Sequence, residues 1–170
     1  MSEILIIPNT ILRRKSIPIK KVSDSEIKLS KRMTKIMNEA PGVGLSAPQL
    51  GILKRIVTIN VKESPDEKNS TYTLFNPEII SYSKNNVLME EGCLSIPKQF
   101  AEIERPEKIH FKYVNEKNAI IEKEAIGNES RVIQHEIDHL EGKLFIDYLS
   151  SLKRNIIIKK VQKLKKFGEI

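Results

Sequence analysis

The chain has 170 residues, of which 39% are hydrophobic, 30% are charged and 5% are aromatic. This length suits one domain with a single substantial core, and the composition excludes a largely disordered protein. The first residues lack the bases and the apolar run of a signal peptide, and no stretch approaches the roughly eighteen apolar residues of a membrane span. We therefore expect a cytoplasmic protein with no membrane segment.

The formal net charge of +7 is concentrated near the C-terminal end. Seven bases and one acid fall between residues 150 and 170, so this segment carries +6 and the remainder is nearly neutral. Because the remainder has no basic motif with interleaved aromatic residues, we expect no specific DNA binding. An RNA-binding module that uses the basic segment alone remains an alternative.

The first predicted element is a helix over residues 23–39. Ser23, followed three residues later by Glu26, has the pattern of a capping box, and Met33 and Met37 lie at helical spacing. A glycine-rich segment follows this helix, and several strands come after it. Dense β-branched or alternating residues predict strands over 52–61, 72–75, 79–82, 109–113 and 119–125, with the polar loop at 64–70.

Two helices complete the predicted order. The first is capped by Asn128 or Ser130 and runs to Glu141, where Gly142 provides the C-terminal stop. The second is basic, and its apolar stripe consists of Ile156, Ile157, Val161, Leu164 and Phe167. We predict an α+β fold with antiparallel β-sheets around a central metal-binding helix, an N-terminal helix and a C-terminal helix. Residues 1–150 would form the catalytic domain, and residues 151–170 a basic helix packed on it.

The central helix contains the sequence His-Glu-Ile-Asp-His, from His135 to His139. Residues four apart share one helix face, which is the spacing that two metal ligands require, and Glu136 could reach a water without binding the metal. Two structural histidines are the plainer alternative. A catalytic metal site has a third protein ligand and an open position. Cys93 is the best candidate because a thiolate binds soft divalent metals, although a lone cysteine is often a buried apolar residue.

The segment from Gly42 to Gly51 contains the weak dinucleotide-binding pattern G-x-G-x-x-A. That motif requires a strand before it and a helix after it, whereas here a helix comes before the segment and Pro48 breaks any helix after it. The segment is therefore predicted to line a cleft, where Gln49 could donate its amide to an oxyanion. A simple connector between a helix and a strand is the alternative.

Together, residues 42–49, 91–95 and 134–140 resemble the three signature motifs of the peptide deformylase family, in the same order. The resemblance implies an enzyme that removes the formyl group from the N-terminal formylmethionine of nascent polypeptides and releases formate. By resemblance, the metal ligands are Cys93, His135 and His139, and the general acid/base is Glu136. The resemblance also implies that the oxyanion donors are the Gln49 side chain and the Leu94 backbone N–H. It further implies that the substrate is bound by Val43, Gly44 and Gly92.

The resemblance also implies one divalent metal. Fe²⁺ is the usual ion of the family, and Zn²⁺, Ni²⁺, Co²⁺ and Mn²⁺ also suit these ligands. Implied partners are N-formylmethionyl peptides and, through the basic C-terminal helix, the ribosome. A zinc endopeptidase or aminopeptidase with the same His-Glu-x-x-His helix is the alternative, but it leaves Cys93 and Gln49 without roles.

Several neighbouring residues carry further expectations. Glu91 and Asp138 are predicted either to hold the second nitrogens of the ligand histidines or to form a salt bridge with Arg105. Three residues depart from the usual family pattern and leave the shape of the methionine pocket open: they are Ser46, Asn128 and Glu129.

Overall fold

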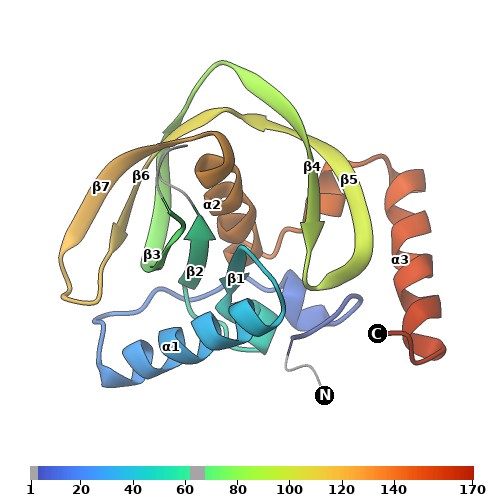
Figure 1. Ribbon diagram of the computed structural model, residues 1–170, viewed down its shortest axis with the longest axis horizontal. Helices are drawn as coiled ribbons and strands as arrows, with labels where there is room; N and C mark the ends of the chain where they lie inside the picture. Colours follow the sequence, from blue (N-terminus) through green and yellow to red (C-terminus); the bar gives the residue numbers. More distant parts are fainter. Residues whose placement is uncertain (1–3, 62–67) are drawn as a thin grey trace.

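The structure is a computed structural model that describes residues 4–61 and 68–170 (Figure 1). The helices are α1 (Asp24–Glu39), α2 (Gly127–Leu140) and α3 (Ser151–Lys166), with short 3-10 helices η1 (Thr10–Arg13), η2 (Ala47–Leu50) and η3 (Phe145–Tyr148). The strands are β1 (Gly44–Ser46), β2 (Ile56–Val61), β3 (Ser70–Tyr82), β4 (Asn86–Cys93), β5 (Ile96–Pro106), β6 (Lys108–Val114) and β7 (Ile120–Ile126). The predicted α+β class is confirmed.

Two antiparallel sheets flank α2. Five strands form one sheet in the order β1-β2-β3-β6-β7, while β4 and β5 form a separate two-stranded ribbon. Figure 1 shows α2 between this sheet and the ribbon, α1 below them, and α3 beside β5 at the outer edge. The predicted central position of this helix is therefore correct.

One of the buried apolar clusters lies on the side of α2 that faces the five-stranded sheet. Val132, Ile133 and Leu140 pack against buried side chains of the sheet such as Ile59 and Phe111. Burying an apolar side chain of this size contributes about 1.5–3 kcal/mol. This packing fixes the rotation of α2 and turns its other face toward the ribbon.

The N-terminus of α2 differs from the prediction. Its N-cap is Ile126, because β7 runs directly into the helix through Gly127, which has φ +60°. Asn128 therefore lies inside the first turn. Ser130 is buried, and its hydroxyl accepts a hydrogen bond from Gln134 Nε2 at 3.0 Å. The predicted stop at Gly142 is observed, with φ +74°.

The strands are predicted less completely than the helices. Residues 72–75 and 79–82 belong to the single strand β3, whose register shifts around Asn76, a residue with φ +49°. The strand predicted from residue 52 begins at Ile56, and the whole β4–β5 ribbon is missing from the prediction. Of the predicted loop at 64–70, residues 64–67 lie outside the described part of the chain.

The basic helix α3 packs on the body through Ile157 and Val161, which are buried with Ile96 and Phe145. The predicted apolar stripe is only partly buried, since Ile156 and Phe167 are exposed. The predicted stripe is too wide because a helix on the rim of a domain buries only a narrow strip. Within the described residues, no helix is both long and apolar enough to cross a membrane.

Candidate active site

Two separate elements bring Cys93, His135 and His139 together. Cys93 ends β4, and the two histidines lie one turn apart on the α2 face that the ribbon covers. One donor atom from each side chain lies within 4.8 Å of the other two, and Cys93 Sγ is 3.2 Å from His139 Nε2. One sulfur and two imidazole nitrogens at this spacing form a donor set that fits a single divalent transition metal.

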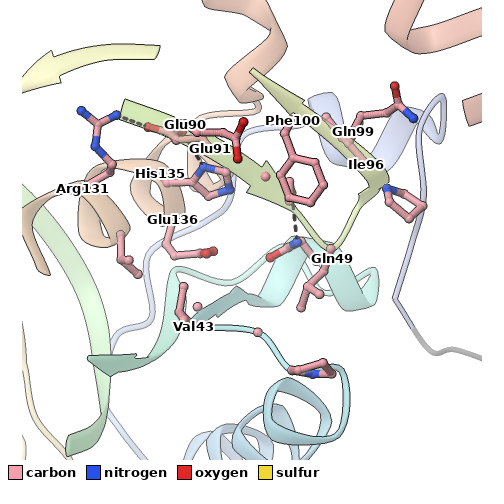
Figure 2. Close-up of a pocket in the computed structure, with 18 of the residues that line it drawn as sticks. Val43, Gln49, Glu90, Glu91, Ile96, Gln99, Phe100, Arg131, His135 and Glu136 are labelled. Atoms are coloured by element: carbon pink, nitrogen blue, oxygen red, sulfur yellow. Dashed lines mark hydrogen bonds and ion pairs between the residues drawn. The ribbon is translucent and has the colours of Figure 1, made fainter. Parts of the chain in front are cut away.

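The orientation of His135 is fixed by Glu91. Glu91 Oε2 lies 3.0 Å from His135 Nδ1, which leaves Nε2 free to face the cluster (Figure 2). The same carboxylate accepts two hydrogen bonds from Arg105, at 2.6 Å and 3.0 Å. Asp138 instead accepts from Arg105 Nη1 and from the Tyr148 hydroxyl. Of the two predicted acids, Glu91 contacts a histidine, and both Glu91 and Asp138 form salt bridges with Arg105.

The electrostatics of the site follow from this pairing. Burial alone would raise the pKa of Glu91, but hydrogen bonds from His135 and Arg105 lower it to about 2. Burial lowers the pKa of His135, yet its bonds to Cys93 and Glu91 outweigh burial and raise it well above the usual value. The pKa of His139 falls well below its usual value because of burial and the neighbouring His135. At neutral pH the Glu91 carboxylate is therefore ionised beside His135.

Glu136 is buried immediately beside the cluster. Burial raises its pKa to about 7, against a weaker lowering effect of the neighbouring His135. Its Oε2 atom has no hydrogen-bond partner among the residues that the structure describes. A carboxylate with this pKa and a free acceptor atom can take up and return a proton near neutral pH.

Ser46 orients the amide of Gln49. The carbonyl oxygen of this amide accepts hydrogen bonds from the Ser46 backbone N–H at 2.9 Å and from its hydroxyl at 3.0 Å. Gln49 Nε2 therefore points the other way, 3.6 Å from Cys93 Sγ and 3.1 Å from Ser95 Oγ. The hydroxyl that departs from the family pattern thus helps to aim a donor N–H at the site.

These groups open into a cleft of about 460 Å³ between the β1 segment and the ribbon. Val43 and Gly44 line one side, while Leu94 and Gly92 line the other. Because β1 is an edge strand of its sheet, its outer side offers backbone groups to an extended peptide. A cleft of this size fits an amino-acid side chain together with a short length of backbone.

The departures at Asn128 and Glu129 have different consequences. Asn128 is exposed and lies at the rim of the cleft. Glu129 is buried on the sheet side, where it accepts from the Tyr72 hydroxyl and pairs with Lys123 at 3.0 Å. Of these two residues, only Asn128 can therefore influence which side chains the cleft accepts.

Sequence reasoning missed two residues beside the site. Arg131 lines the cleft and bonds Glu91 at 2.7 Å, and Ser95 holds the Gln49 amide. Arg131 lies four residues before His135 and so shares its helix face. That spacing is the signal that could have pointed to it.

Comparisons with known proteins agree with this geometry. Residues 1–155 match the family model for polypeptide deformylase. A peptide deformylase of Rickettsia canadensis is 46% identical over 166 residues, which are 95% of each chain. A crystal structure of peptide deformylase from Ehrlichia chaffeensis superposes with a TM-score of 0.92 at 37% identity and covers 98% of both chains.

A third similar protein was crystallised with a bound peptide. It is the class I type b peptide deformylase of Acinetobacter baumannii bound to Met-Ala-Ser, with a TM-score of 0.81 at 31% identity over 86% of this chain and 96% of that one. Because the family model spans most of the sequence and the relatives cover nearly all of it, the chain belongs to the polypeptide deformylase family, the metal-dependent hydrolases that remove the formyl group from nascent polypeptides.

Proposed function

We propose that this chain hydrolyses the formyl amide of N-formylmethionyl peptides at the cleft between β1 and the ribbon. The observation that carries the proposal is the meeting of Cys93, His135 and His139 beside a buried, protonatable Glu136. These three ligands would hold the divalent metal of the family. When bound, such an ion lowers the pKa of water and polarises a carbonyl oxygen.

Glu136 serves as the general acid and base. Its carboxylate accepts a proton from the water that adds to the formyl carbon. As the bond between the formyl carbon and the peptide nitrogen breaks, the same carboxylate returns the proton to that nitrogen. Formic acid and a free methionyl amine are the immediate products, and the acid then loses its remaining proton to solvent as formate, so all atoms and charges balance.

Gln49 and Leu94 stabilise the oxygen that gains negative charge. Gln49 Nε2 already points toward Cys93, and Leu94 follows Cys93 directly in the turn between β4 and β5. The Leu94 backbone N–H is therefore next to the same reaction centre. Donors held in place before the reaction need no reorganisation when the charge forms.

The substrate lies along β1 in an extended conformation. Gly44 and Val43 contribute backbone groups on one side of the cleft. On the other side Gly92, which has no side chain, leaves room for the substrate. The methionine side chain enters between the ribbon and α2, where Arg131 and Val132 form the wall. The Met-Ala-Ser peptide bound by the Acinetobacter relative has the sequence that such a cleft would release.

Formate release from formyl-Met-Ala-Ser by the metal-loaded protein tests this proposal. We expect Glu136→Gln to reduce kcat by at least about a hundredfold, because the variant can neither accept nor return the proton. Unchanged kcat in that variant, or hydrolysis of casein without formate release, would contradict the proposal and favour the endopeptidase alternative.

We also infer that Fe²⁺ is the resident metal and that the protein acts in the cytoplasm. The mixture of one thiolate and two imidazoles suits iron, zinc, nickel, cobalt and manganese alike, so metal analysis of protein purified without oxygen decides the identity. We further infer that residues 1–150 are the catalytic domain and that the basic helix of residues 151–170 docks on the ribosome.

A further inference from the structure

Arg131 is a buried arginine with no part in the chemistry described above. Its side chain is 7% exposed, and it lies on α2 one turn before His135. Its Nη1 atom donates to Glu91 Oε1 at 2.7 Å and to the Ile103 carbonyl at 2.9 Å, while Nη2 donates to the Val87 carbonyl at 2.6 Å. A single guanidinium therefore satisfies three acceptors.

All three acceptors belong to the β4–β5 ribbon. Val87 and Glu91 lie on β4, and Ile103 lies on β5, so Arg131 ties α2 to both strands. This tie bears on the metal site because the ribbon carries the candidate thiolate, whereas α2 carries both candidate imidazoles. The distance between sulfur and nitrogen depends on how firmly the ribbon is held against the helix.

Arg131 also completes the environment of Glu91. Oε1 of that carboxylate accepts from both Arg131 and Arg105. Oε2 faces His135 Nδ1, and Figure 2 shows Glu91 between Arg131 and His135. Two guanidinium groups on different elements fix the plane of the carboxylate more firmly than one does, because charge-assisted hydrogen bonds are directional. The direction of Oε2, and hence the tilt of the His135 ring, follows from that plane.

We propose that Arg131 is a positioning residue for the metal ligands: it locks the ribbon and Glu91 against α2, so that Cys93 and His135 converge on one point. The inference rests on the proposed function, since it takes these side chains as metal ligands. Removing a residue that orients metal ligands through hydrogen bonds typically lowers metal affinity or activity by about 10- to 100-fold.

Two substitutions of Arg131 test the inference. Arg131→Met keeps an unbranched stem along the cleft wall but removes the guanidinium, and Arg131→Lys keeps one cation beside Glu91. The matched control is Arg55→Met. Arg55 is also largely buried, at 12% exposure, and its guanidinium likewise bonds a carboxylate, that of Glu141 at 2.5 Å, and the Pro77 carbonyl at 3.2 Å.

Each variant is loaded with Co²⁺, a probe whose visible and near-ultraviolet absorption reports the thiolate bond. Release of Co²⁺ to a chelator, the thermal midpoint, and kcat and KM for formyl-Met-Ala-Ser are then measured. For Arg131→Met we expect release at least about tenfold faster, a weakened thiolate-to-cobalt band and a lower kcat, with KM changed by less than about threefold. Arg131→Lys should fall between this variant and the wild type.

Arg55→Met should lower the thermal midpoint without changing cobalt release. The inference is overturned if an Arg131 variant that folds keeps the cobalt release rate and the absorption of the wild type. It is also overturned if Arg55→Met accelerates cobalt release equally. Failure of the proposed function looks different: the loaded wild-type protein would release no formate, while the cobalt comparison would still decide the role of Arg131.

Discussion

At the scale of single residues, glycines allow neighbouring groups in the candidate site to lie unusually close to the backbone. A Cβ atom on Gly44 would lie 2.4 Å from Glu136 Oε1, and one on Gly92 would lie 2.6 Å from the ring of Phe100. Both distances are far below normal contact. Glycine at position 44 is therefore a condition for the position of the Glu136 carboxylate.

We predict that Gly44→Ala lowers kcat for formate release by about ten- to a hundredfold, because the methyl group displaces the Glu136 carboxylate. Gly42→Ala is the matched control. Its Cβ would meet only the end of the flexible Leu94 side chain, at 2.7 Å, so its effect should be smaller. Equal kcat in the two variants would show that Glu136 does not depend on this contact.

The Gln49 amide gives a second prediction at this scale. Gln49→Leu should reduce kcat on the order of a hundredfold, since an oxyanion loses a donor that is already in place. Ser46→Ala should change kcat by less than about threefold, because the Ser46 backbone N–H still holds the amide oxygen. Steady-state kinetics on formyl-Met-Ala-Ser separate the two, and a larger loss in Ser46→Ala would mean that the hydroxyl has a direct catalytic role.

At the scale of elements, α1 is stabilised at its start by the capping box that the sequence predicts. Glu26 accepts from the Ser23 backbone N–H at 3.1 Å, and Lys54 bonds its other oxygen at 2.6 Å. The bond from Lys54, followed by that from the Ser23 hydroxyl, lowers the pKa of Glu26 to about 2, against the opposing effect of burial. A carboxyl group whose pKa is lowered on folding stabilises the folded state above its unfolded pKa.

We therefore predict that Glu26→Gln lowers the free energy of unfolding by about 1–2 kcal/mol at pH 7. The difference from the wild type should shrink as pH falls from about 4.5 to about 2, because the wild-type carboxyl becomes protonated over that interval. Urea unfolding at several pH values measures it. A constant difference across this range would contradict the lowered pKa.

At the scale of the whole molecule, charge is distributed unevenly. The basic helix α3 lies at the edge of the fold beside β5, with Ile157 and Val161 packed inward and most lysines in solvent (Figure 1). None of the residues that line the cleft belongs to α3, so a partner on the exposed face of α3 need not enter the cleft. Exposed lysines favour an anionic partner such as ribosomal RNA.

We predict that reversing the charge of Lys159, Lys160 and Lys163 to glutamate abolishes co-sedimentation with ribosomes and leaves kcat/KM on free peptide unchanged. All three side chains are exposed, so the fold should persist. The control reverses three lysines of α1, which are Lys28, Lys31 and Lys35. Binding should also weaken steeply with salt. Co-sedimentation that survives in the α3 variant, or is lost equally in the control, would refute this role.

Much of the fold could be predicted where neighbours in sequence determine local geometry. Three features follow from residues that are near neighbours in the sequence: the capping box of α1, the hairpin of β6 and β7, and the stop of α2 at Gly142. The ribbon could not be predicted in this way. On β4, Leu88, Met89 and Glu90 are all exposed, whereas Glu91 is buried and pairs with Arg105 and Arg131, which lie on other elements.

The sequence by itself determined the chemistry available to this protein: two imidazoles on one helix face, an acid between them, a lone thiol and a glycine-rich segment with an amide. Only the tertiary structure decided which of these groups meet. Cys93 and His139 are 46 positions apart, and their contact depends on core packing that rotates α2 and on the arginines that hold the ribbon. Local spacing follows from helix geometry, whereas convergence over such a distance is a property of the packed whole.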